Sequence, residues 1–241
     1  TASAEMLAYM WYIIENGANI LIAGGVSTGK TSMLNAISMF IPSELKIVSI
    51  EDTRELNLPH ENWIPGVARV GFTGTGVGEV DMFQLLKESF RQNPDYLIVG
   101  EIRGKEAYVM FQGMASGHPS ISTIHAGGIN DLIKRLETEP INLSPGLLES
   151  LDAVIVMIHA REHGKQCRAD TLRKRVHQVH LFLRIRKKWR EQFFLKLRQV
   201  RELLVEEEVV EEDAVLRQLV EALLDPTPAV AVAVQGIPAL R

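Results

Sequence analysis

Short apolar runs alternate with stretches of helical periodicity along the first two thirds of the chain. The apolar runs predict buried strands at residues 18–23, 46–50, 95–101, 120–125 and 153–158. Apolar residues at helical spacing predict helices at residues 4–15, 32–40, 81–92, 105–116 and 130–137. Strands that alternate with helices imply a largely parallel sheet with helices on both faces. We therefore expect an α/β fold.

Two parts of the chain do not follow this alternation. Pro59, Pro65 and Gly66 predict an irregular connection after the second strand, and residues 70–78 are rich in glycine. Beyond residue 160 the chain becomes basic, then acidic, and ends in a segment rich in Ala, Val and Pro. We therefore divide the chain into a core at 1–160 and an extension at 161–241, which we expect to contain a basic helical segment and a loose tail.

The turn between the first strand and the helix at 32–40 carries the clearest chemical signal. Its sequence fits G-x-x-x-x-G-K-[ST], the phosphate-binding P-loop, in the strand–loop–helix context that the motif requires. Glycines let the backbone curl around an anion, and the loop N–H groups and the helix N-terminus point at the phosphates. Lys30 is expected to reach the β- and γ-phosphates, and the Thr31 hydroxyl is expected to hold Mg²⁺. The expected nucleotide-binding residues are Gly24, Gly25, Val26, Ser27, Thr28, Gly29, Lys30, Thr31 and Ser32.

Acidic residues lie at the carboxyl ends of two of the predicted strands. In P-loop enzymes the acids that act on the metal ion and on the attacking water lie at these ends. Glu101 ends the strand at 95–101, with Gly100 where many such enzymes have a metal-binding Asp. Glu51 and Asp52 end the strand at 46–50. A carboxylate near the γ-phosphate can orient or deprotonate the attacking water. We favour this role for Glu101 over that of a helix-start acid.

Two histidines flank the predicted strand at 120–124. A neutral imidazole can donate to a phosphate oxygen, and a charged one can sense its loss. His125, at the carboxyl end, is better placed for this than His118. The His, Cys and acidic residues show no zinc spacing, so we expect no structural metal.

Composition limits the classes of function. The net charge of −4 gives no general attraction to nucleic acid or membranes. Cys167 is the only cysteine, which excludes an intrachain disulfide and favours a reducing, intracellular compartment. There is no apolar run of about 18 residues and no visible signal peptide. Because the sequence begins at Thr1, we interpret it as a domain of a longer protein.

Four sequence boxes in order resemble the secretion ATPase superfamily, the hexameric motors of type II secretion, type IV pili and the archaeal flagellum. Residues 24–31 are similar to its Walker A motif and 50–55 to its Asp box. Residues 93–104 are similar to its atypical Walker B motif, which accounts for Gly100, and 117–126 to its His box. Residues 58–63 resemble the archaeal branch in particular. The resemblance covers roughly residues 4–160, and the extension is poorly matched.

The resemblance implies a RecA-like P-loop core that hydrolyses ATP with Mg²⁺. It implies that Glu101 positions the hydrolytic water beside Lys30, that Glu51 assists, and that His125 monitors the γ-phosphate. Three arginines lie at family-like positions, namely Arg91, Arg103 and Arg135. The resemblance implies that one of them reaches across a subunit boundary.

The resemblance also implies partners. They are further copies of the chain in a hexameric ring, a membrane-embedded platform protein, and an N-terminal domain of the same protein that closes over the nucleotide. The expected location is the cytoplasm, at the inner face of the cell membrane.

We therefore expect an ATP-hydrolysing motor subunit, and two alternatives stay open. The first is a nucleic-acid translocase of the RecA type, supported only by the basic segment at 173–201. Such runs are more often solvated faces, so no nucleic-acid partner is expected. The second alternative is a nucleotide-binding assembly subunit without turnover.

Overall fold

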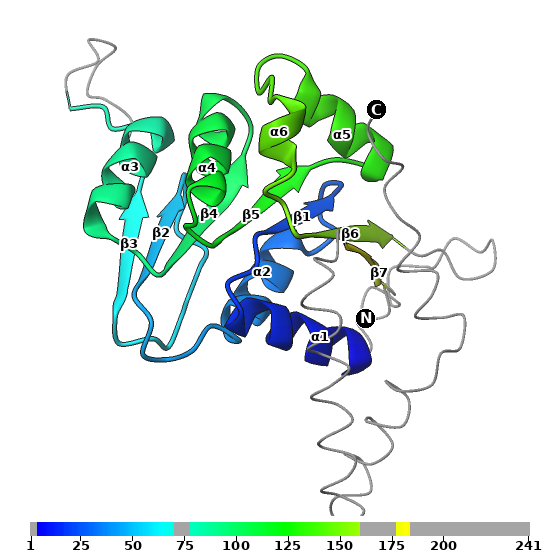
Figure 1. The fold of residues 1–241 in the computed structure, drawn as a ribbon, viewed down its shortest axis with the longest axis horizontal. Helices are drawn as coiled ribbons and strands as arrows, with labels where there is room; N and C mark the ends of the chain where they lie inside the picture. The colour runs from blue at the N-terminus through cyan, green and yellow to red at the C-terminus, as the bar shows by residue number, and fades with distance from the viewer. Residues whose placement is uncertain (1–3, 70–77, 160–176, 184–241) are drawn as a thin grey trace, which may run out of the picture.

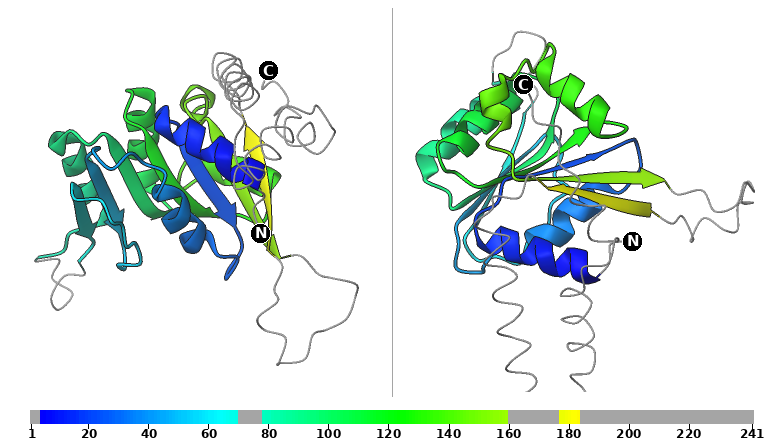
Figure 2. Two further views of the ribbon diagram at one scale, coloured as in Figure 1. Left: turned by 90° about the horizontal axis from the view of Figure 1, so that it is seen from below. Right: turned by 45° about the vertical axis from the view of Figure 1, so that its right-hand side comes forward.

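A computed structural model describes residues 4–69, 78–159 and 177–183, which form a seven-stranded sheet with helices on both faces (Figures 1 and 2). The strand order is β3-β2-β4-β5-β1-β6-β7. The pairs from β3 to β6 are parallel, and β7 is antiparallel to β6. The expected α/β fold with a largely parallel sheet is confirmed. The strands are β1 (Ile20–Gly24), β2 (Ile47–Glu51), β3 (Trp63–Val67), β4 (Tyr96–Ile102), β5 (Ser120–His125), β6 (Ala153–His159) and β7 (His177–Leu183).

The helices form one layer on each side of the sheet (Figure 2). The first layer consists of α1 (Ala4–Glu15) and α2 (Lys30–Ser38). The opposite layer consists of α3 (Met82–Ser89), the 3-10 turn η2 (Phe90–Gln92), α4 (Lys105–Ala115), α5 (Ile129–Glu137) and α6 (Pro145–Leu148). Ile20 and Ile22 of β1 pack in the core beneath α1 and α2, whereas Leu21 and Ala23 pack in the opposite core. Strands buried on both faces read as continuous apolar runs, which is why the sequence identified them.

The strand β3 corrects a prediction, because the irregular connection expected around Pro65 and Gly66 is wrong there. Both residues lie in β3, which pairs in parallel with β2, Ser49 opposite Pro65. Proline has no N–H to donate and is tolerated at a sheet edge, where only one side of the strand is paired. In the sheet of the described residues, β3 is such an edge.

Most other predicted elements are found with small shifts at their ends. Asp81 caps α3 as expected and accepts a hydrogen bond from the Gln84 N–H at 2.7 Å, but the α-helix ends at Ser89. The short helix α6 was not predicted. β7 lies in the basic segment of the expected extension. The remainder of that extension, and residues 70–77 of the glycine-rich stretch, lie outside the described residues. Among the described helices, none combines the length and the apolar character needed to cross a membrane.

Asn19 joins the amino ends of three strands, at the edge of the sheet opposite the P-loop. Its backbone N–H donates to Asp152 Oδ2 at 3.0 Å, and its side-chain amide donates to the Ser150 carbonyl at 2.8 Å. Its side-chain oxygen accepts from the Ser120 N–H at 3.0 Å. Asn19 is 4% exposed, so water cannot replace these partners. The residue therefore fixes the starts of β1, β5 and β6 relative to one another.

We predict that Asn19→Ala lowers the free energy of unfolding by about 2–3 kcal/mol, because it leaves a buried N–H and a buried carbonyl without partners. Urea denaturation followed by circular dichroism measures this. The control is Asn16→Ala, at an exposed residue, which removes one part-buried hydrogen bond to the Tyr12 carbonyl. Equal destabilisation by the two variants would contradict the role given to Asn19.

Candidate functional site

The P-loop follows β1 in a conformation that two of its glycines make possible. Gly29 has a φ of +86°, in the left-handed region that favours glycine. A Cβ on Gly24 would lie 2.4 Å from Thr28 Oγ1 and 3.0 Å from the Met157 carbonyl oxygen. The loop therefore closes against β6 in a way that a side chain at position 24 would prevent. The following residue, Lys30, begins α2.

Two side chains of the loop donate to the same backbone oxygen. Thr28 Oγ1 lies 3.0 Å and Lys30 Nζ 2.8 Å from the Gly25 carbonyl oxygen. Thr28 is buried, Lys30 and Thr31 are half-buried, and Val26, Ser27 and Ser32 are exposed. Lys30 is thus folded back onto a neutral group of its own loop and keeps its charge available for a ligand.

The surroundings of Lys30 change its acidity. Burial lowers the pKa of Lys30 most, the negative charge of Glu101 opposes this by raising it, and the positive charge of Arg103 lowers it. The Glu101 carboxylate is therefore within electrostatic reach of the Lys30 ammonium. The structure brings these two predicted site residues to the same edge of the sheet.

Glu51 is the buried acid of the site. It ends β2, is 2% exposed, and its Oε1 accepts from the N–H groups of Glu55 and Leu56, both at 2.9 Å. Its Oε2 is buried without a hydrogen-bond partner. Buried polar atoms are normally satisfied, so an unpartnered carboxylate oxygen at this edge is the feature expected where a cation or a water molecule binds.

Glu101 lies on β4 and is held by an ion pair. Its Oε2 is 2.6 Å from Arg103 Nη2, and Arg103 Nη1 is 3.7 Å from Asp52 Oδ2. The hydrogen bond to Glu101 is the main reason that the pKa of Arg103 is raised. Glu101 is half-buried and Arg103 is exposed. Arg103 thus pairs with an acid of its own chain, which sequence reasoning did not predict.

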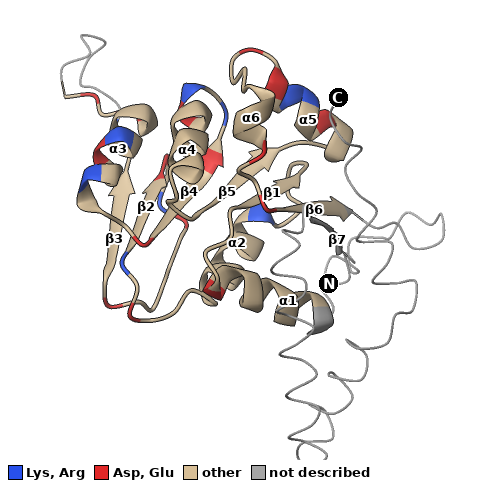
Figure 3. Cartoon of the chain, viewed as in Figure 1, with Lys and Arg blue, Asp and Glu red and all other residues tan. Residues whose placement is uncertain are grey.

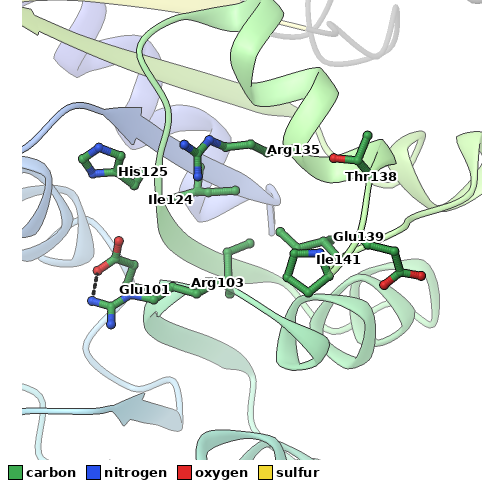
Figure 4. Close-up of a pocket in the computed structure, with 10 residues that line it drawn as sticks. Glu101, Arg103, Ile124, His125, Arg135, Thr138, Glu139 and Ile141 are labelled. Atoms are coloured by element: carbon green, nitrogen blue, oxygen red, sulfur yellow. Dashed lines mark hydrogen bonds and ion pairs between the residues drawn. The ribbon is translucent and has the colours of Figure 1, made fainter.

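His125 ends β5 and pairs directly with Gly24 of β1 in the parallel register. With Glu101, Arg103 and Arg135 it lines a cavity of about 470 Å³. Figure 4 shows Arg135 extending from α5 toward the side of this cavity where His125 and Glu101 lie. Arg135 Nε is 3.5 Å from Asp131 Oδ1, and Asp131 Oδ2 accepts from the Gly127 N–H at 2.8 Å. That N–H is the largest cause of a lowered pKa of Asp131, to which Arg135 and His125 also contribute.

Two candidates of the sequence lie away from this edge. Arg91 belongs to η2, which precedes β4, and pairs with Glu88 at 3.1 Å. His118 precedes β5, and its ring lies edge-on to Phe90 with 5.1 Å between ring centroids. Both residues therefore lie at the amino ends of these strands. Asp131 and Thr123, in contrast, lie beside the site, and the sequence had assigned neither of them a role there, although Thr123 falls within the box at 117–126.

Comparisons with known proteins agree on one family. The family model described as type II/IV secretion system protein matches residues 2–223. The chain is 51% identical over 163 residues to a protein of uncharacterised function from Methanocaldococcus jannaschii, covering 68% of this chain and 60% of that protein. It is 32% identical over 173 residues to VirB11 of Agrobacterium fabrum, covering 67% and 49% respectively. The chain therefore spans about half to three fifths of the length of these relatives.

Solved structures share the fold. The VirB11 ATPase of the Brucella suis type IV secretion system, in complex with sulphate, matches with a TM-score of 0.58 at 23% identity, over 73% of this chain and 51% of that one. The Legionella pneumophila ATPase DotB matches with a TM-score of 0.57 at 16% identity, over 92% of this chain and 56% of that one. These likenesses support the RecA-like ATPase fold.

The two adjacent glycines of the loop give a matched prediction. Gly24→Ala is expected to lower the free energy of unfolding by about 1–3 kcal/mol, since its Cβ must displace Thr28 or the backbone at Met157. Gly25→Ala meets only Thr28 Cγ2 at 3.7 Å, an ordinary contact, so we expect it to cost less. Thermal unfolding of both variants measures the difference, and a larger loss for Gly25→Ala would contradict the loop geometry.

Proposed function

The chain belongs to the type II/IV secretion system protein family, and from that premise we propose that it is an ATP-hydrolysing motor subunit. Its work is the secretion of proteins or the assembly of a surface filament, either a type IV pilus or an archaeal flagellum. One observation carries the proposal: the P-loop opens from the end of β1, where Gly24 pairs with His125 of β5, and His125 lines the same cavity as Glu101 of β4. A nucleotide bound by the loop then has its terminal phosphate near that acid.

In this proposal the residues from Gly24 to Ser32 hold the phosphates of ATP through backbone N–H groups and the start of α2. The Lys30 ammonium leaves the Gly25 carbonyl for the β- and γ-phosphates. The half-buried Thr31 hydroxyl, in the first turn of α2, is the proposed protein ligand of Mg²⁺. A hydroxyl oxygen suits Mg²⁺, which prefers oxygen ligands and keeps several waters, and the buried Glu51 Oε2 is an unpartnered oxygen at the same edge of the sheet. When bound, Mg²⁺ neutralises charge on the phosphate oxygens.

Hydrolysis then needs a base or orienting group for water, and Glu101 is the proposed residue. Its carboxylate is engaged by Arg103, so release of this ion pair is the step that frees it to accept a hydrogen bond from the attacking water. Glu51, fixed by two backbone N–H groups, assists as a second acid with a defined orientation. Catalysis by such a site consists mainly of positioning and charge stabilisation.

His125 is proposed to report the state of the γ-phosphate. Its pairing with Gly24 places it beside the P-loop, and it shares the cavity with Glu101 and Arg135. A hydrogen bond from its ring to the γ-phosphate exists with ATP and is lost with ADP. Arg135 on α5 lines the same cavity as His125 and pairs with Asp131 at 3.5 Å, so these two residues are placed to respond to the same change.

We propose further that the chain works as a hexameric ring with a membrane-embedded platform protein, at the cytoplasmic face of the cell membrane. Head-to-tail contacts that close on themselves give rings. Arg91 and Arg135 are exposed, on opposite ends of the domain, and either is able to meet a neighbouring subunit. The greater length of the relatives is consistent with a further domain that closes over the nucleotide.

Nucleic-acid translocation is the weaker alternative. The helices α3, α4 and α5 each carry charges of both signs (Figure 3), so they offer no uniformly basic surface. The basic segment at 173–201 lies outside the described residues apart from β7.

We predict that Glu101→Gln lowers kcat for ATP hydrolysis by about 100-fold or more, because an amide neither accepts the proton nor polarises the water. Its affinity for ATP is expected to stay close to that of the wild type. Phosphate release and fluorescent-nucleotide titration measure the two quantities, with Glu88→Gln, an exposed acid paired with Arg91, as control. Wild-type turnover by Glu101→Gln would contradict the proposed role, and binding without turnover by the wild type would favour the assembly subunit.

A separate prediction concerns His125. His125→Gln is expected to reduce the preference for ATP analogues over ADP by about tenfold, the size of one hydrogen bond to a charged group. Competition titrations with both nucleotides measure this preference. His118→Gln is the control, because that ring packs against Phe90. An unchanged preference in His125→Gln would exclude the sensing role.

A further inference from the structure

The pairing of β4 with β5 is interrupted next to Glu101. Val99 pairs with Ser122 and Ile102 pairs with Ile124, so that Gly100 and Glu101 together face the single residue Thr123. This two-against-one arrangement is a β-bulge, a feature that re-aims side chains near functional sites.

The bulge decides whether Glu101 or Ile102 enters the core beneath α3 and α4. Leu97 and Val99 point into the core beneath α3 and α4, so unbroken alternation would bury Glu101 on that same face. In the structure Ile102 occupies that core instead, and Glu101 is half-buried and lines the cavity with His125. A shift of the register by one residue exchanges the two faces of a strand. Here it places Ile102 in the core position that Glu101, the proposed catalytic acid, would otherwise occupy.

Thr123 holds the bulge from the side of β5. Its hydroxyl donates to the Gly100 carbonyl at 2.7 Å, and the residue is 2% exposed. On the side of β2, Glu51 packs on Gly100 so closely that a Cβ there would lie 3.2 Å from Glu51 Cγ. Gly100 is therefore confined between a threonine hydroxyl and the stem of the second proposed acid.

We propose that Thr123 is a positioning residue for the reaction: its hydroxyl fixes the bulge that turns Glu101 toward the nucleotide. The inference rests on the proposed function for the identity of the reaction. It gives Thr123, two residues before His125 on β5, a role in positioning Glu101 that is separate from the proposed role of the histidine. Thr123 acts through the Gly100 carbonyl and not by contact with the nucleotide.

The test compares three variants in the full protein. Thr123→Val keeps the shape and removes the hydroxyl, Thr123→Ser keeps the hydroxyl, and Ser122→Ala removes the neighbouring buried hydroxyl, which donates to the Thr123 carbonyl at 3.3 Å. We expect Thr123→Val to lower kcat about tenfold or more, since small misplacements of catalytic groups have effects of this size. KM and the affinity for ADP stay unchanged. Thr123→Ser restores most of kcat, and Ser122→Ala stays near the wild type.

Amide hydrogen exchange of residues 100–102, measured without nucleotide, separates this inference from the proposed function. We expect faster exchange there in Thr123→Val than in Thr123→Ser or Ser122→Ala. Absence of ATP turnover in the wild type would contradict the proposed function alone. Unchanged exchange in Thr123→Val, unchanged kcat, or equal losses of kcat in Thr123→Val and Ser122→Ala would overturn the positioning role.

Discussion

The ion pair between Glu101 and Arg103, at 2.6 Å, occupies the Glu101 carboxylate. It thereby keeps this carboxylate from pairing with the Lys30 ammonium. A lysine that is to bind phosphates must not be neutralised by the acid that is to act on water. Lys30 donates to the neutral Gly25 carbonyl, and the Glu101 carboxylate is occupied by a guanidinium. In the proposed mechanism, each charge leaves its present partner when a nucleotide binds.

The sheet supplies the geometry for this balance. In parallel strands the carboxyl ends meet at one edge, so the ends of β1, β2, β4 and β5 bring Gly24, Glu51, Glu101 and His125 together. The amino edge has the opposite character, because Asn19 fixes it through buried hydrogen bonds. The proposed motor role needs this division, because the partners that a nucleotide would exchange lie at one edge and the strands are fixed to one another at the other edge.

The sequence predicted those features whose cause is local. The P-loop is encoded by residue types over eight positions, and the acids were identified because buried apolar runs lead directly into them. β3 was missed because Pro65 signals a break everywhere except at a sheet edge, and edge position depends on strand order. The pairing of Arg103 with Glu101 was missed because three arginines had equal claims in the sequence. The bulge at Gly100 was missed because it is a property of the register between β4 and β5.

The most direct test of the account is a crystal structure of the protein with Mg²⁺ and a non-hydrolysable ATP analogue. The account predicts that Lys30 Nζ exchanges the Gly25 carbonyl for the β- and γ-phosphates, and that Glu101 leaves Arg103 to accept a hydrogen bond from a water near the γ-phosphate. Phosphates bound elsewhere, or Glu101 still paired with Arg103 and facing away from the γ-phosphate, would contradict it.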